Sequence, residues 1–485
     1  MCLLGCKNKE PTLFVALNNS ETGIAFVNEV VETEALNVMQ YEYLYNGGGV
    51  GVGDFNNDGL TDIYMTGNVV ENKLYLNKGN FRFEDVSHLS GVQGREGWKT
   101  GTSVADVNGD GLLDIYVCYS GLAKEEGRSN QLFINKGKGD NNVPQFVDEA
   151  AAYGLDAKGS YSTQAVFFDY DLDGDLDMFL LNHSKTFYSP FYNSTKLRNT
   201  RHPFFGNSLY RNDGNNFVNV SESAGIYGSG LNFGLGVSIS DFNQDGWPDI
   251  YVSNDYDEQD FLYINKGDGT FLDSSKKSFG HISKFSMGND AADVNNDGVM
   301  DLVTLDMLPE DNYRQKILKG SDDYDRYQLA VDSSYHKQQM RNMLQLGQGL
   351  DDNELPIFSE IGQMAGISNT DWSWSSLIAD FDNDGRKDLF VTNGYLRDYT
   401  NKDFMMFEVN EAMAKASAKG KSLFDDKGKK EFSKIIYELV KKMPSTKIPN
   451  YMFRNQGDLI FENVSDEWGF SNPNVSTGAA YVDLD

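Results

Sequence analysis

The sequence has few cysteines, prolines and histidines, and it has no long apolar run. Its three cysteines, Cys2, Cys6 and Cys118, are too few for a disulfide framework. Cys118 follows an apolar run and is expected to be a small buried core residue. No stretch of 18 apolar residues occurs, so we expect no membrane-spanning helix. None of the five histidines lies in a recognisable catalytic motif, and the patterns typical of serine hydrolases, zinc proteases and P-loop enzymes are missing.

Basic residues are also scarce, because 42 lysines and arginines face 72 aspartates and glutamates, for a formal net charge of -30. This excess of acid repels phosphate groups and disfavours nucleic acid as a partner. Hydrophobic residues make up 40% of the chain, which is enough for a folded core. The 48 glycines and only 10 prolines are typical of many short strands joined by tight turns.

The acidic residues are concentrated in a repeated nine-residue pattern, D-x-[DN]-x-D-G-x-x-D. A seventh copy begins at Asp483-Leu484-Asp485, where the sequence stops. The complete copies are Asp54–Asp62, Asp106–Asp114, Asp169–Asp177, Asp241–Asp249, Asp293–Asp301 and Asp380–Asp388.

The residues around each copy repeat as well. A run of small or apolar residues precedes the acidic loop, a β-rich run follows it, and two further strand patterns complete the unit. Four short antiparallel strands, repeated six or seven times, indicate an all-β, seven-bladed-type β-propeller over residues 12–485. Helical insertions are expected at about 311–343 and 402–442. The seventh blade is expected to be incomplete, with 14–24 as its outer strand, an inner strand beginning at 478–481, and its middle strands beyond the end of the sequence.

The spacing of oxygen-bearing residues in the loops predicts calcium sites, about six in number. Calcium takes six to eight oxygen ligands, and positions 1, 3, 5 and 9 supply them from side chains while position 7 supplies its backbone carbonyl. Glycine at position 6 permits the sharp turn around the ion. The expected ligands, loop by loop, are Asp54, Asn56, Asp58, Leu60 and Asp62; Asp106, Asn108, Asp110, Leu112 and Asp114; Asp169, Asp171, Asp173, Asp175 and Asp177; Asp241, Asn243, Asp245, Trp247 and Asp249; Asp293, Asn295, Asp297, Val299 and Asp301; and Asp380, Asp382, Asp384, Arg386 and Asp388.

Two other interpretations of the loops are weaker. An EF-hand needs an acid at position 12, and none of the six copies has one there. A plain hairpin turn needs one Asp-Gly pair and not four spaced oxygens. Magnesium is disfavoured because it demands stricter geometry and keeps more of its water.

The first residues predict a lipid anchor. Leu3-Leu4-Gly5-Cys6 resembles a bacterial lipobox, in which the cysteine is lipidated, and polar residues follow it as a tether. Residues 1–11 are therefore interpreted as a signal remnant and tether, with Cys6 as the lipidation site. A full signal needs a longer charged and apolar leader than these five preceding residues provide. Membrane contact is expected through the anchor alone, in the bacterial cell envelope as an outer-membrane lipoprotein or in the extracellular space.

Taken together, the loops and strand patterns resemble FG-GAP/VCBS repeat proteins, whose calcium loops are like those of integrin α-subunit propellers. The run Tyr-Asn-Gly-Gly-Gly at 45–49 and the segment 306–313 look like a group of large Bacteroidetes surface lipoproteins. Those proteins often carry an ASPIC/UnbV domain, and none is visible in this sequence. The resemblance implies the fold and the calcium sites, and it says little about the ligand.

The expected function is a binding or adhesion scaffold that recognises a protein or glycan, and not an enzyme. The alternative is a propeller-type polysaccharide lyase or hydrolase, since the fold hosts such enzymes. The stretch 183–202, which contains Tyr188, Phe191, Tyr192, Arg198 and Arg201, is a candidate contact surface, although a packed rim loop explains it as well.

Overall fold

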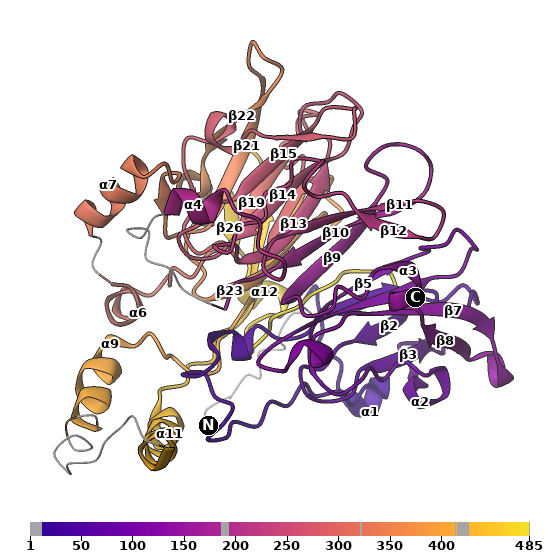
Figure 1. Cartoon of the computed structure of the whole chain (residues 1–485), viewed down its shortest axis with the longest axis horizontal. Helices are drawn as coiled ribbons and strands as arrows, with labels where there is room; N and C mark the ends of the chain where they lie inside the picture. The colour runs from indigo at the N-terminus through magenta and orange to yellow at the C-terminus, as the bar shows by residue number, and fades with distance from the viewer. Residues whose placement is uncertain (1–11, 186–193, 321–322, 413, 415–425, 485) are drawn as a thin grey trace, which may run out of the picture.

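The computed structural model describes residues 12–185, 194–320, 323–412, 414 and 426–484. The lipidation site expected at Cys6 and the aromatic residues Tyr188, Phe191 and Tyr192 lie outside these ranges. Within them the chain is a β-propeller (Figure 1).

Six four-stranded antiparallel sheets form six blades, and the strands of each blade are neighbours in chain order. A short parallel pair, β17 (Ile282–Ser283) and β20 (Gln338–Gln339), lies outside the blades. The blades consist of β1 Val50–Gly53, β2 Asp62–Met65, β3 Lys73–Asn77 and β4 Phe83–Asp85; β5 Trp98–Ala105, β6 Asp114–Ser120, β7 Gln131–Lys138 and β8 Pro144–Asp148; β9 Ser162–Phe168, β10 Asp177–Asn182, β11 Ser208–Asn212 and β12 Phe217–Asn219; β13 Gly234–Ser240, β14 Asp249–Asn254, β15 Phe261–Asn265 and β16 Phe271–Asp273; β18 Asn289–Ala292, β19 Asp301–Thr304, β21 Met343–Leu350 and β22 Pro356–Glu360; and β23 Ser373–Ala379, β24 Asp388–Asn393, β25 Tyr451–Asn455 and β26 Phe461–Asn463.

Burial differs between the strands of a blade, and this explains their sequence patterns. The second strand is covered on both faces by the neighbouring blades, so every residue of β6 and of β14 is buried. The fourth strand lies at the outer rim, where only its leading phenylalanine is buried, as in β4 and β26. Apolar packing between blades therefore supplies the core.

A helical turn follows the fourth strand in five of the blades and is part of the contact with the next blade. These turns are α2 Ser87–Ser90, α3 Ala150–Tyr153, α5 Ser275–Ser278, α8 Gly362–Ala365 and α12 Ser465–Trp468. The glycine that ends such a turn, for example Gly469 with φ 104°, has the left-handed conformation that ends helices.

Residues 12–28 and 474–484 occupy the place of a seventh blade between blade 6 and blade 1. Phe14 donates its backbone N–H to Trp468, as Phe271 does to Ala224 between blades 3 and 4. α1 (Asn19–Thr22) then repeats the helical turn. On the other side, Ser476 donates its N–H to the carbonyl of Asn393 at the end of β24. Neither segment forms a regular strand, but both lie where the sequence analysis placed the outer and inner strands of this blade.

The inserted helices all lie on the face opposite the acidic loops. The acidic loops join the first and second strands of each blade, whereas the insertions join the second and third strands and so leave from the other end of the sheet. Figure 1 shows them together on one side of the molecule. They are α4 Ser194–Arg198, α6 Asn312–Leu318, α7 Tyr324–Asp332, α9 Lys402–Phe404, the π-helical turn Met405–Val409, and α11 Asp426–Lys442. The helical pattern expected over 311–343 stops at Asp332, because β20 and then β21 begin in the remainder.

A segment before the first blade closes the centre of this face. The side chains of residues 36–45, which we call the plug, pack against buried residues from blades 5 and 6 and from α9 and α11. The Tyr43 hydroxyl donates to Asp255 of blade 4 at 3.0 Å, and the Tyr395 hydroxyl of blade 6 donates to the backbone carbonyl of Glu42. The plug therefore joins blades that are far apart in the sequence.

Candidate metal centre

Each acidic loop is held in shape by the carboxylate at its first position. In loop 1, one Asp54 oxygen accepts the N–H of Asp58 at 3.0 Å and the other accepts the N–H of Gly59 at 2.7 Å. The other five complete loops contain the same two hydrogen bonds. Gly59 has φ 88°, a conformation that glycine adopts without a steric cost. The local sequence thus fixes a turn that gathers the acidic side chains on its inner side.

The carboxylate at position 9 has a structural role in addition to that of a candidate ligand. Asp249 is fully buried, and its two oxygens accept the N–H of Phe242 at 2.9 Å and the N–H of Asn265 at 2.7 Å. These two bonds connect the loop, the start of the second strand and the end of the third strand. All six loops repeat them. Sequence reasoning assigned these residues as ligands alone and missed this role.

Burial also shifts the pKa of the position-9 carboxyls. It raises the pKa of Asp62, Asp177 and Asp249 to about 7, although the two backbone N–H groups act in the opposite direction. The acids at positions 1 and 5 add to the rise in Asp62 and Asp249. A cation in the loop would compensate this crowding of negative charge.

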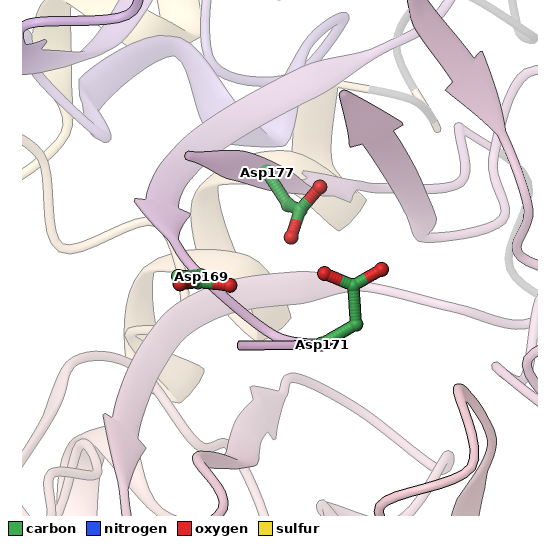
Figure 2. A group of neighbouring side chains, drawn as sticks. All are labelled: Asp169, Asp171 and Asp177. Atoms are coloured by element: carbon green, nitrogen blue, oxygen red, sulfur yellow. The ribbon is translucent and has the colours of Figure 1, made fainter. Parts of the chain in front are cut away.

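Loop 3 brings three carboxylates to one point. Oxygens of Asp169, Asp171 and Asp177 lie within 4.8 Å of one another (Figure 2). One oxygen of Asp171 and one of Asp175 are buried without a hydrogen-bond partner. A buried carboxylate oxygen without a donor is costly unless a cation binds it. The donor set is entirely oxygen, so these residues fit a calcium ion.

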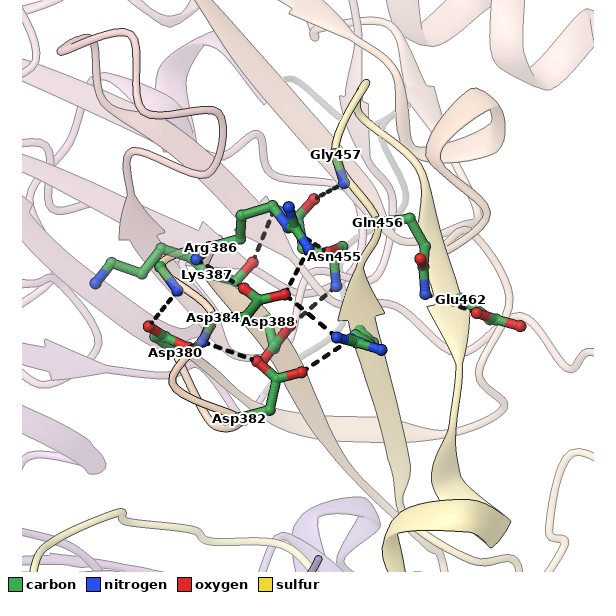
Figure 3. A network of polar contacts seen from close by, with 12 residues as sticks. Asp380, Asp382, Asp384, Arg386, Lys387, Asp388, Asn455, Gln456, Gly457 and Glu462 are labelled. Carbon is green, nitrogen blue, oxygen red and sulfur yellow. Dashed lines mark hydrogen bonds and ion pairs between the residues drawn. The ribbon is translucent and has the colours of Figure 1, made fainter.

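Loop 6 forms the second three-carboxylate group, and it already contains cations. Oxygens of Asp380, Asp382 and Asp384 lie within 4.8 Å of one another. Arg386 contacts Asp384 at 2.5 Å (Figure 3). Arg454 of β25 contacts Asp382 at 2.8 Å and Asp384 at 3.4 Å.

The other four loops have asparagine at position 3 and lack such a three-carboxylate group among the described residues. Their expected ligands are still brought together. Asn243 donates its side-chain amide to Asp245, and the buried side-chain oxygen of Asn56 has no hydrogen-bond partner. The structure thus gathers the side chains of positions 1, 3 and 5 in one turn, next to the buried carboxylate at position 9.

Neighbouring loops are joined to one another through position 4. Asn57 donates its side-chain amide to the carbonyl of Gly111 at 3.1 Å, and Asn296 does the same to Gly385 at 3.0 Å. Gln244 makes the equivalent bond to Gly298. A change in one loop can therefore be transmitted to the next blade.

The hub contains a buried histidine paired with a serine hydroxyl. The ring of His183 is buried, its Nδ1 faces the carbonyl of Ser184 at 2.8 Å, and its Nε2 lies 2.6 Å from the Ser120 hydroxyl. Burial lowers the pKa of His183 to about 4, so the neutral ring accepts from Ser120. Tyr41 and Tyr43 of the plug pack against the ring. A hydrogen-bonded core histidine explains this pair.

The described part of the stretch 183–202 is engaged within the protein. Arg198 forms an ion pair with buried Glu258 at 2.7 Å, and Arg201 donates twice to the carbonyl of Asn207. These contacts are those of a packed rim.

Comparison with known proteins agrees with the repeat. The model of the FG-GAP-like repeat family matches residues 54–117 and 241–304, each of which runs from one acidic loop into the next blade. The chain contains FG-GAP-like repeats. It is 27% identical over 276 residues to cartilage acidic protein 1 of Xenopus tropicalis. That alignment covers 53% of this chain and 39% of the relative, so the chain spans well under half of that protein.

Some solved structures resemble the chain distantly. An Agrocybe aegerita lectin, described as recognising non-reducing terminal N-acetylglucosamine, is 13% identical, with a TM-score of 0.42 and coverage of 87% of this chain and 83% of its own. A GH43 β-1,3-galactosidase is 12% identical, with a TM-score of 0.30 and coverage of 64% and 93%. Likenesses at these scores support no inference about ligand or activity.

None of the helices in the described ranges is both long and apolar enough to cross a bilayer.

Proposed function

We propose that this chain is a calcium-stabilised binding or adhesion scaffold of the cell exterior, anchored as a surface lipoprotein through Cys6 and recognising a protein or glycan. The main support is that all six complete loops use the same hydrogen bonds to hold carboxylates close together. In two of the loops, three carboxylate oxygens lie within 4.8 Å of one another. Such crowding is repulsive without a cation.

In this proposal the ion holds a blade together and performs no chemistry. The ligands would be the side chains at positions 1, 3, 5 and 9 with the carbonyl at position 7. An ion that binds the folded loop and not the open chain stabilises by about 2.7 kcal/mol at a hundredfold excess over Kd. Extracellular calcium modules bind at about 10⁻⁴ to 10⁻³ M, so millimolar calcium contributes about 1 kcal/mol or more per site. Six sites together approach the net stability of a whole domain.

The alternative is a propeller-type polysaccharide lyase or hydrolase. Ser120 and His183 form a hydrogen-bonded hydroxyl–imidazole pair, and the side chains of Tyr41 and Tyr43 pack over the ring. The burial of this pair favours a role in packing over one in catalysis.

The test is thermal melting and limited proteolysis of the purified chain with calcium and with a chelator. We expect the chelator to lower Tm substantially and to expose the blades to protease, with recovery when calcium is added back. A Tm and a cleavage pattern that do not change, together with no calcium in the purified protein, would rule out the metal role. A glycan array with the calcium-loaded chain tests the ligand class.

A further inference from the structure

Loops 3 and 6 differ from the other four loops in two features that occur together. Both have aspartate at position 3, Asp171 and Asp382, where the others have asparagine. Both also have an arginine on the third strand, just before the residue whose N–H bonds the position-9 carboxylate. These are Arg211 in β11 and Arg454 in β25, where the other blades have leucine or isoleucine. The extra negative charge in the loop is therefore accompanied by a positive charge on the adjacent strand.

The two arginines occupy equivalent places in their blades. Asn212, which follows Arg211, donates its N–H to Asp177 at 2.8 Å, and Asn455, which follows Arg454, donates its N–H to Asp388 at 2.9 Å. Each arginine thus lies next to the residue that bonds the position-9 carboxylate of its own loop.

The two side chains nevertheless bind different carboxylates. Arg454 contacts Asp382 and Asp384 of its loop at 2.8 and 3.4 Å. Arg211 binds Asp213 instead, through two hydrogen bonds of 2.8 and 3.1 Å. Two parallel bonds between a guanidinium and a carboxylate form a stronger and more specific pair than one.

The residue that follows the strand-end asparagine, Asn212 in blade 3 and Asn455 in blade 6, explains the difference. Asp213 of blade 3 corresponds to Gln456 of blade 6, which has no charge with which to bind an arginine. Gln456 donates to Glu462 at 2.7 Å, and Figure 3 shows both side chains away from the loop. Glu462 is the cross-strand neighbour of Arg454, and one of its oxygens accepts from Gln456.

We propose that Arg454 acts as the resident cation of loop 6, so that loop 6 binds calcium more weakly than loop 3, and that Asp213 keeps loop 3 open by holding Arg211 away from it. This inference rests on the proposed calcium role. It also makes the two loops functionally unequal: loop 3 depends more strongly on calcium for its shape, whereas Arg454 partly supports the shape of loop 6 without the ion.

The test is hydrogen exchange of the full chain, followed in peptides covering 169–177 and 380–388 across a calcium titration. In the wild type, loop 3 should become protected at a calcium concentration about three- to tenfold lower than loop 6, the range expected for one partly exposed ion-pair network. Gln456→Asp should draw Arg454 away and lower the midpoint of loop 6. Asp213→Gln should release Arg211 and raise the midpoint of loop 3.

Two further variants separate this inference from the calcium role itself. In chelator, Arg454→Gln should accelerate exchange in 380–388, because Asp382 loses its cation while Arg386, among these carboxylates, still contacts only Asp384, and calcium should restore protection. Arg211→Gln is the matched control and should leave 169–177 unchanged in chelator. Equal midpoints in the wild type and in both switch variants would overturn the inference, as would unchanged exchange of Arg454→Gln in chelator. A wild type with no calcium response in any loop would refute the calcium role, and the chelator comparison would still decide the role of Arg454.

Discussion

The side-chain amide of Asn77 in blade 1 donates a hydrogen bond of 3.3 Å to the backbone carbonyl of Leu484. The same bond joins blade 2 to loop 1, from Asn135 to Phe55 at 2.9 Å, and blade 6 to loop 5, from Asn455 to Val294 at 2.8 Å. In those pairs the acceptor is position 2 of the preceding loop. Leu484 is position 2 of the seventh copy. It therefore contacts blade 1 in the same way that the loop of a preceding blade contacts the next blade.

Asn77→Ala should therefore loosen the seventh sector selectively. We expect a loss of at least about 1 kcal/mol, the usual net value of one hydrogen bond, because the side chain also donates to Thr61 and accepts from Gly79. Hydrogen exchange in 474–484 should become faster. Asn212→Ala is the matched control, because the described side-chain donation of Asn212 is to Leu176 within its own blade. Equal exchange of 474–484 in both variants would contradict the role of Asn77.

Positions 1 and 9 of a loop should respond differently to calcium. Asp249→Asn places an amide donor against two backbone N–H groups in a buried site, so it should cost about 3 kcal/mol with or without calcium. Asp241→Asn keeps an acceptor in an exposed turn, and most of its cost should disappear in chelator. Urea unfolding of both variants in calcium and in chelator measures the difference. If the cost of Asp249→Asn disappeared in chelator, position 9 would be a ligand without a structural role.

Asp255 should make the protein less stable as pH rises. Burial raises the pKa of Asp255 to about 8, with Asp306 and Glu42 adding to the rise, against an unfolded value of about 3.9. The folded state therefore holds the extra proton between these values, and the free energy of unfolding falls as pH increases from about 4 to 8. Asp255→Asn cannot ionise and should gain about 1 kcal/mol or more over the wild type between pH 5 and pH 8.

Melting curves at pH 5 and pH 8 measure this gain. Asp466→Asn, at an exposed position, is the control and should follow the wild type at both values. A wild type and an Asp255→Asn variant with the same pH dependence would show that Asp255 does not stay protonated in the plugged hub.

The lipid anchor has a direct chemical test. In the native cells, an alkyne-labelled fatty acid should label the wild type and Cys2→Ser, and should leave Cys6→Ser unlabelled, because the lipobox positions one cysteine for modification. Label that persists in Cys6→Ser, or a wild type without label, would refute the anchor.

The sequence by itself determined the features that depend on neighbours within about ten residues. The nine-residue loop sets its own turn through Asp54 and Gly59, and alternating short strands on either side of it form a four-stranded blade. For this reason the number of loops, the all-β blade and the place of the insertions between strands could be predicted. The strand β21 was not predicted, because the helical composition of the preceding insertion dominated that region.

Only the tertiary structure decided which charges meet. Arg454 contacts Asp384, which lies 70 residues earlier in the sequence. Arg211 and Arg454 occupy similar sequence positions, but Arg211 pairs with Asp213. Gln456 bonds to Glu462, and Arg454 contacts its acidic loop. Likewise, Tyr43 meets Asp255 across 212 residues, and that contact covers a histidine that had no assigned role in the sequence. Such pairings depend on how the blades are arranged around a common centre. The local sequence cannot predict the distance between two side chains when that distance is set by the closure of the ring.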